Sequence, residues 1–150
     1  YLEPEVHADP RVVEAIQNCD AVVLAPGDLF TSLVPILLVN GVSQAIEASS
    51  AQLIMIANLH TKNSETGGYK LSDFLSTLVQ YLGGNTIFDS VIANNENIQM
   101  HEGNQRVELD LDASNNWTRG IKLRPVASLE NLGFHDPVRT ADAILEVLNL

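Results

Sequence analysis

Residues 20–41 read DAVVLAPGDLFTSLVPILLVNG, and this stretch decides the fold class. It begins with a short, wholly apolar run, Ala21 to Ala25, which is typical of a strand buried on both faces of a parallel sheet. Pro26-Gly27-Asp28 breaks the run, and a helix is predicted from about Leu33 to Leu38. A buried strand, a turn and a helix in direct succession indicate one unit of an α/β fold.

The rest of the chain repeats this alternation. We predict further strands over residues 52–57, 88–93 and 121–126, an edge strand over 107–111, and helices over residues 9–18, 41–49, 73–82 and from 136 onward. The predicted helix caps are Asp9, Thr31 or Ser32, and Ser72. Strands that alternate with helices predict an α/β fold with a mainly parallel sheet, in one domain of 150 residues.

The charge balance limits the partners. The chain carries 8 Lys and Arg against 19 Asp and Glu, a net charge of −11, which argues against broad binding to nucleic acid or to an anionic membrane. No apolar run approaches ~18 residues, so no membrane span is predicted. One cysteine, Cys19, rules out an internal disulfide framework and fits a reducing compartment. An anionic ligand would therefore be held by backbone N–H groups, a few cations or a metal.

Polar segments follow three of the predicted strands, at residues 26–32, 58–68 and 94–97. Ligands of parallel sheets bind beyond the carboxyl ends of the strands, so these segments form the predicted site. In the first segment Gly27 lets a ligand approach the backbone, the helix start suits phosphate, and the hydroxyls of Thr31 and Ser32 can donate to it. The alternative is an ordinary capped joint between a strand and a helix.

The other segments and one strand residue supply further candidates. His60 is a candidate general base, metal ligand or ligand contact, and Glu65 a candidate base or metal ligand; a solvated side chain is the alternative for each. Asn94 and Asn95 can hydrogen-bond a base or a sugar, or they can form a turn. Arg124 can meet a phosphate or form a structural salt bridge.

The common catalytic and nucleotide fingerprints do not occur in the sequence. It holds no GxxxxGK[ST] or GxGxxG motif, no GxSxG elbow and no Cys/His spacing that suits zinc.

Several stretches together resemble one protein family. Residues 20–41 are similar to the strand and phosphate-type loop of the gluconeogenesis-factor and 2-phospho-L-lactate transferase (CofD-like) family, which usually reads ADxIVxGPGSLYTSIxPNLLVxG. Residues 58–69, NLHTKNSETGGY, resemble the family's NLMTQPGETxGY loop. Four shorter elements fit in the same order: residues 2–4, the strand 88–95 that ends in two asparagines, Glu102-Gly103 with Val107 and Asp110, and His135-Asp136-Pro137.

The resemblance implies a Rossmann-like, doubly wound fold in a cytoplasmic protein. It also implies that residues 1–150 are the C-terminal part of a single domain, since the family's glycine-rich first turn lies upstream. One branch of the family transfers a phospholactyl-type group from a nucleotide diphosphate donor to a deazaflavin, with a divalent metal such as Mg²⁺. The other branch resembles a nucleotide-sugar-binding regulator of carbon metabolism and cell-wall synthesis. Residues 26–32 and 65–69 look closer to this second branch.

The sequence departs from the family pattern within the predicted site. The family's first glycine is replaced by Ala25, its serine by Asp28 and its tyrosine by Phe30; its loop methionine is replaced by His60. An aspartate in an anion-binding turn repels phosphate unless a metal bridges the two. We therefore expect the ligand preference to differ from that of the family.

Three hypotheses follow. In the first, the protein binds a nucleotide sugar of the UDP-sugar type as a regulator, with no nucleic-acid or membrane partner. In the second it is a transferase in which Asp28 and Glu65 hold a divalent metal. In the third it has no independent ligand affinity and acts only through a missing half or a partner in a homo-oligomer. The predicted ligand-binding residues are Pro26, Gly27, Thr31, Ser32, Asn58, His60, Thr61, Lys62, Thr66, Asn94, Asn95 and Arg124.

Overall fold

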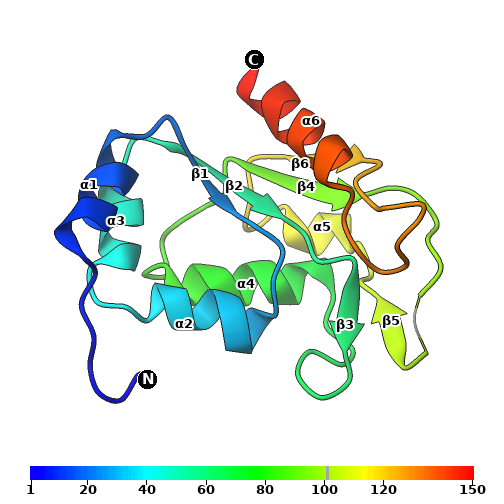
Figure 1. Ribbon diagram of the computed structural model, residues 1–150, viewed down its shortest axis with the longest axis horizontal. Helices are drawn as coiled ribbons and strands as arrows, with labels where there is room; N and C mark the ends of the chain where they lie inside the picture. The colour runs from blue at the N-terminus through cyan, green and yellow to red at the C-terminus, as the bar shows by residue number, and fades with distance from the viewer. Residues whose placement is uncertain (101) are drawn as a thin grey trace.

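Four parallel strands form the main sheet of the computed structural model, which describes residues 1–100 and 102–150. In spatial order they are β1 (Ala21–Leu24), β2 (Gln52–Ile56), β4 (Ser90–Asn94) and β6 (Ile121–Arg124). All four arrows in Figure 1 point to the same side, so their carboxyl ends share one edge. Since helices cover both faces, the predicted doubly wound, parallel α/β fold is confirmed.

The connections carry the helices and a small second sheet. The helices are α1 (Pro10–Asn18), the π-helical turn η1 (Leu29–Leu33), α2 (Val34–Leu37), α3 (Val42–Ala48), α4 (Leu71–Tyr81), α5 (Leu111–Ser114) and α6 (Pro137–Leu148). The second sheet is an antiparallel ribbon of β3 (His60–Lys62) and β5 (Asn104–Arg106), which lies beyond the carboxyl ends of the main strands (Figure 1). Within residues 1–100 and 102–150, no helix has the length and apolarity that crossing a bilayer requires.

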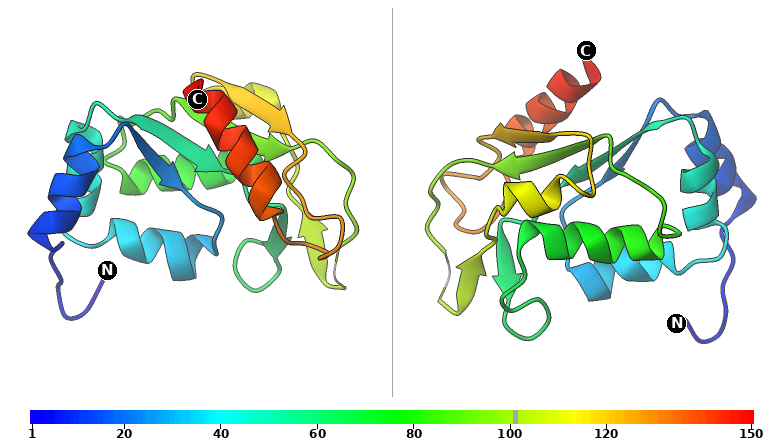
Figure 2. Two further views of the ribbon diagram at one scale, coloured as in Figure 1. Left: turned by 45° about the horizontal axis from the view of Figure 1, so that its top comes forward. Right: turned by 180° about the vertical axis from the view of Figure 1, so that it is seen from behind.

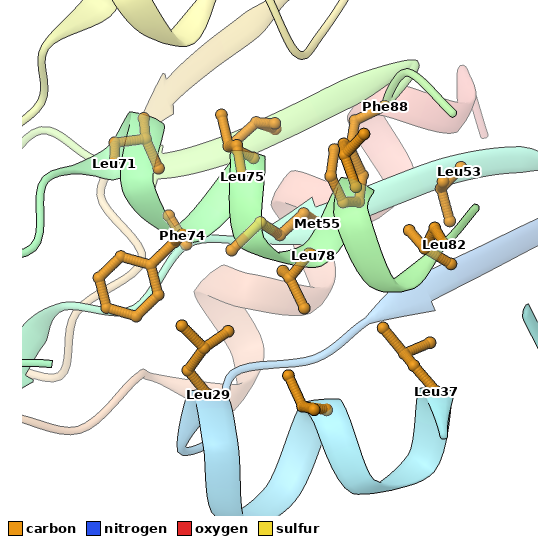
Figure 3. Close-up of a cluster of buried hydrophobic side chains, with 14 of the residues drawn as sticks. Leu29, Leu37, Leu53, Met55, Leu71, Phe74, Leu75, Leu78, Leu82 and Phe88 are labelled. Carbon is orange, nitrogen blue, oxygen red and sulfur yellow. The ribbon is translucent and has the colours of Figure 1, made fainter. Parts of the chain in front are cut away.

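The larger core lies on the sheet face that α4 covers. Apolar side chains recur along α4 at the spacing of one helix face, and five of them are buried: Leu71, Phe74, Leu75, Leu78 and Val79. Figure 3 shows Leu29 and Leu37 pointing toward them from the opposite side, with Met55 of β2 between. Because burying one such side chain contributes roughly 1.5–3 kcal/mol, this cluster is the main source of the fold's stability.

The opposite sheet face is covered by α6 (Figure 2). Ile54, Ile56 and Ile92 point to this side and are buried. Within α6, Ala143 is the buried residue, while Ile144 and Leu148 are half-buried. The helix therefore packs on the sheet along one narrow line, and another of its faces is left for the site described below.

Two predicted helix starts differ from the structure. The helix predicted from Leu33 already begins at Leu29, so Thr31 and Ser32 lie inside η1 and do not cap it. Ser72, the predicted cap, is instead the second residue of α4. Its N–H and its hydroxyl both donate to the carboxylate of Asp110, so its side chain does not cap the helix.

The segment predicted as a long loop and the predicted edge strand also differ. Residues 58–68 contain β3, which pairs with β5 at residues 104–106. The edge strand predicted over 107–111 is displaced toward the N-terminus, because Val107 bonds only to Leu59 and Leu111 already begins α5. The predicted cap Asp9 is confirmed, since its carboxylate accepts the N–H of Arg11. The helix predicted from residue 136 onward is capped by Asp136, whose carboxylate accepts two N–H bonds of the first turn.

Candidate functional site

A cavity of about 780 Å³ lies at the carboxyl edge of the sheet, between the ends of β1 and β2 and the start of α6. Its size is that of a pocket for a small organic ligand, and its place is where parallel sheets bind ligands. Its lining comes from four parts of the chain: Pro26, Gly27, Asp28; Asn58, His60, Lys62; Asn104; and Gly133, Phe134, His135, Pro137, Thr140, Ala141, Ile144.

The first wall is built from the segments that leave β1 and β2. The Asn58 side chain holds these segments together, since its Nδ2 donates to the carbonyl oxygen of Gly27 over 2.8 Å. Asp28 and Lys62 form an ion pair across the same gap, with side chains 34% and 45% exposed. Of the lining residues that the structure describes, Lys62 is the one Lys or Arg, so it is the candidate cation for an anionic ligand.

The β3–β5 ribbon explains why alternate residues reach the cavity. Side chains alternate along a strand, so His60 and Lys62 share one face of β3 and Thr61 points to the other. Residues directly opposite in an antiparallel pair share a face as well: Asn104 opposite Lys62, and Arg106 opposite His60. Thr61 is buried and donates to the carbonyl of Gln105, which fixes the ribbon instead of serving the cavity.

The second wall is one face of α6 and the loop before it. Pro137, Thr140, Ala141 and Ile144 follow the i, i+3, i+4, i+7 spacing of a single helix face. The carboxylate of Asp136 accepts the N–H groups of Val138 and Arg139 at 3.0 and 2.9 Å. The first turn of α6 is thus already capped, and this helix start does not offer its N–H groups to an anion.

Three buried polar atoms of the cavity lining have no hydrogen-bond partner among residues 1–100 and 102–150. They are Asn58 Oδ1, His60 Nδ1 and Thr140 Oγ1. A buried polar atom without a partner costs about 1–3 kcal/mol, and native structures hold few of them. All three such atoms of the described chain belong to residues that line one cavity, which makes Asn58, His60 and Thr140 the candidates for contact with a ligand.

Two histidines lie close together in the site. His135 Nε2 bonds to the carbonyl oxygen of Ala57 over 3.1 Å, and because a carbonyl only accepts, Nε2 carries the hydrogen. Burial lowers the pKa of His135 below its usual value; the bond to Ala57 opposes this shift and the charge of a protonated His60 adds to it. His135 is therefore held neutral near pH 7.

Of the predicted site residues, the structure brings six together at the cavity: Pro26, Gly27, Asp28, Asn58, His60 and Lys62. Thr31 and Ser32 are exposed on η1, outside the described lining. Thr66 is buried and its hydroxyl accepts the N–H of Lys62 at 3.1 Å, and Glu65 accepts the N–H of Phe30 at 2.9 Å. Both residues fix the loop around Lys62.

The predicted residues at the ends of β4 and β6 have structural contacts. Asn94 bonds to Ala127 N and to Glu96 O, and Asn95 is exposed. Arg124 pairs with Glu146 of α6, which raises the pKa of the guanidinium. The salt-bridge alternative for Arg124 thus describes its contact in the structure.

The sequence prediction missed the whole α6 wall. The family pattern includes His135-Asp136-Pro137 as the start of the last helix and gives it no role in the predicted site. A signal was present: the helix carries apolar residues on more of its circumference than one packing line needs, at Ala141 and Ile144 as well as Ala143. Phe134 gave no such signal, because a lone aromatic in a polar loop has no periodicity.

The described residues do not make a metal site by themselves. No group of three or more His, Cys, Asp or Glu in residues 1–100 and 102–150 is placed to hold a metal ion. Of the two predicted carboxylates, Asp28 is neutralised by Lys62 and Glu65 is bonded to a backbone N–H. The ammonium group already occupies the place beside Asp28 where a cation would sit.

Comparisons with known proteins show the family to which the chain is similar. The family model of 2-phospho-L-lactate transferase CofD matches residues 1–127. The gluconeogenesis-factor relative from Thermotoga maritima is 32% identical over 95% of this chain, and the gluconeogenesis factor of Halalkalibacterium halodurans is 41% identical over 53% of it. A crystal structure of a UPF0052 family protein from Bacillus halodurans superposes on 97% of the chain with a TM-score of 0.88 and 29% identity.

The matched proteins are longer. The chain spans about half of the relatives that match most of its length: 48% of the Thermotoga relative and 49% of the Bacillus structure. The aligned 53% of the chain covers 25% of the Halalkalibacterium relative. A substantial part of each relative therefore has no counterpart in these 150 residues.

Proposed function

Since this chain belongs to the family of 2-phospho-L-lactate transferase CofD and the gluconeogenesis factors, we propose that its cavity binds a nucleotide sugar of the UDP-sugar type. In this proposal the protein is a regulator of carbon metabolism or cell-wall synthesis that responds to the bound nucleotide. The relatives matched over most of this chain are gluconeogenesis factors, which favours regulation over transfer.

The observation that carries the proposal is the set of three unpartnered atoms on the cavity lining. Asn58 Oδ1 can only accept a hydrogen bond, so its partner in the ligand is an O–H or N–H group. The ionised phosphoryl oxygens of a nucleotide diphosphate offer no such donor, whereas the hydroxyls of a ribose or a sugar do. Asn58 thus supports contact with the sugar part of such a ligand and not with its phosphates.

Lys62 supports the anionic part of the ligand. Its ammonium lies at the cavity edge in a chain of net charge −11, where free cations are scarce. A diphosphate near Lys62 places the sugar within the same 780 Å³ cavity as Asn58. Thr31 and Ser32 stay candidates only for a ligand long enough to extend past the cavity over η1.

The test is titration calorimetry of the protein that contains this chain, with a UDP-sugar in the syringe. Asn58→Ala should weaken binding roughly tenfold, because it removes one charge-neutral acceptor from a buried contact. Asn116→Ala, an exposed asparagine away from the cavity, is the matched control and should bind like the parent. Equal affinity of the Asn58 variant and the control would overturn the proposal.

The second candidate function is group transfer from a nucleotide diphosphate donor to a deazaflavin. The match of residues 1–127 to the CofD family model favours it. Among the lining residues that the structure describes, Asp28 is the one carboxylate that could coordinate the metal of that reaction. The other oxygen ligands of the metal would come from the bound substrate. Turnover of a deazaflavin acceptor in the presence of Mg²⁺ would establish this function; no turnover and no effect of Mg²⁺ on thermal stability would exclude it.

A further inference from the structure

Phe134 is an exposed aromatic residue in the loop before α6, and hydrogen bonds fix the backbone of this loop. Its side chain lines the cavity while the residue is 64% exposed. Backbone bonds fix the loop: Ser128 N donates to Phe134 O at 2.9 Å, and Asp136 N to Val126 O at 2.8 Å. The Ser128 hydroxyl also accepts two N–H groups inside the loop. An exposed ring in a loop this well bonded leaves apolar surface in water, which costs free energy that a bound ligand would recover.

The helix beside Phe134 presents a shallow apolar strip. Pro137 and Ala141 are exposed and Ile144 is half-buried, and all three lie on the face of α6 that lines the cavity. Short side chains along a helix leave room above them, and Phe134 belongs to the same cavity lining. Thr140 lies on the same helix face, one turn after Pro137 and one turn before Ile144, and its hydroxyl has no partner among the described residues.

This wall differs chemically from the wall across the cavity. The polar side chains of the strand wall are Asp28, Asn58, His60, Lys62 and Asn104. The α6 wall is apolar apart from Thr140 and the neutral His135. A ligand that suits both walls has a charged or hydroxylated end and a flat apolar end with a hydrogen-bonding edge. Nucleotides and flavin nucleotides have that composition.

We propose that Phe134, with Pro137, Ala141 and Ile144, forms a subsite that stacks a planar heteroaromatic ring, with Thr140 bonding to the ring edge. The subsite orients the ligand, since the ring lies against α6 and the phosphates lie toward Lys62. This proposal rests on the proposed function, because it assigns one part of the same cavity. The ring is a nucleobase or a flavin-type ring, and the two sources are separated below.

The experiment titrates UDP, uridine, flavin mononucleotide and inorganic pyrophosphate into the protein and into two variants. Phe134→Ala should weaken binding of the ring-bearing ligands roughly tenfold or more, the usual effect of removing an aromatic stacking partner. Pyrophosphate, which has no ring, should bind the variant as it binds the parent. Leu129→Ala is the matched control, because Leu129 is equally exposed in the same loop but lies outside the described lining.

Two further variants give readouts that a merely structural role would not move. Phe134→Trp should retain binding, and the new indole fluorescence should change with UDP or with flavin mononucleotide, according to which ring binds. Thr140→Val should weaken uridine binding and leave pyrophosphate binding unchanged.

The outcomes separate the two proposals. If UDP and flavin mononucleotide bind Phe134→Ala as tightly as the parent, the subsite is overturned while the nucleotide-binding function stands. If uridine binds through Phe134 and pyrophosphate does not bind, the subsite stands and the phosphate contact at Lys62 is overturned. If none of the four ligands binds the parent protein, both proposals are overturned.

Discussion

Asp28 and Asp136 stand at equivalent places on opposite walls of one cavity, yet their carboxylates have different partners. Each is the residue immediately before a helix, η1 or α6. The Asp136 carboxylate accepts two N–H groups of its own helix, at 3.0 and 2.9 Å. The Asp28 carboxylate makes no capping bond within the described residues and pairs with Lys62 at the cavity edge.

The difference shows how a structural aspartate can be told from a candidate functional one. An aspartate before a helix is by default a cap, because the first-turn N–H groups need acceptors. The carboxylate of Asp28 does not accept a first-turn N–H of η1, and the carboxylate of Glu65 accepts the N–H of Phe30 instead. A carboxylate that leaves its own helix uncapped and faces a cavity is therefore a candidate for ligand chemistry.

The largest expected effect concerns the partner of Asp28. Lys62→Met should weaken binding of UDP or pyrophosphate tenfold or more, about 1.4 kcal/mol, because it leaves an uncompensated carboxylate facing the anion. The free energy of unfolding should change by less than about 1 kcal/mol, since the ion pair is partly exposed. Calorimetric titration and urea unfolding measure the two quantities. Lys122→Met, an exposed lysine on β6, is the control, and equal affinities for both variants would contradict the prediction.

The next effect tests Asp136. Asp136→Ala should lower the free energy of unfolding by about 1 kcal/mol through loss of the α6 cap. The melting temperature should fall by roughly 3 °C for a chain of this size. Asp28→Ala should cost less than about 0.5 kcal/mol, because no cap is lost. If the two alanine variants were equally destabilised in urea unfolding, the contrast between the aspartates would be wrong.

A smaller effect separates the two candidate functions. Asp28→Asn keeps the size of the side chain and removes its charge, so the ammonium of Lys62 becomes available and pyrophosphate should bind roughly two- to fivefold more tightly. A metal-dependent transferase predicts the opposite, since it would lose its carboxylate ligand. Titration with and without Mg²⁺ measures the sign directly.

The smallest effect is a pH dependence at His135, directly before Asp136. The pKa of His135 is lowered in the fold, mainly by burial, so the unfolded chain binds more protons in the range just below its usual pKa of about 6.5. Stability should therefore be complete above pH 6.5 and decline as the pH falls below it, before the carboxylates titrate. His135→Asn should flatten this decline and His7→Asn, at an exposed position, should not. An unchanged slope in the His135 variant would show that another group titrates there.

The sequence predicted the parts of the fold that depend on local pattern. The apolar runs at 21–25 and 52–57 became β1 and β2, and Asp9 and Asp136 cap their helices, because burial and capping are set by neighbouring residues. The β3–β5 ribbon was missed, since it joins residues 60–62 to 104–106 across more than forty positions. A pairing of this kind leaves no periodic signal in three-residue strands.

The site was predicted from one side only. Residues after β1 and β2 were expected at the carboxyl edge by the general rule for parallel sheets, and six of them line the cavity. Thr31 and Ser32 lie elsewhere because the helix begins at Leu29 and not at Leu33, where the pattern placed its start. The α6 wall depends on how a distant helix crosses the sheet, which no local pattern encodes.

The Asn58 amide links the segment that follows β1 to the segment that follows β2. One end of its amide donates to Gly27 O and the other end, Oδ1, is unpartnered among the described residues. An amide polarised at one end becomes stronger at the other, so a ligand that donates to Oδ1 tightens the bond to Gly27. We therefore expect a bound ligand to strengthen a hydrogen bond to the backbone of residues 25–28. Slower amide hydrogen exchange in that turn would then report binding.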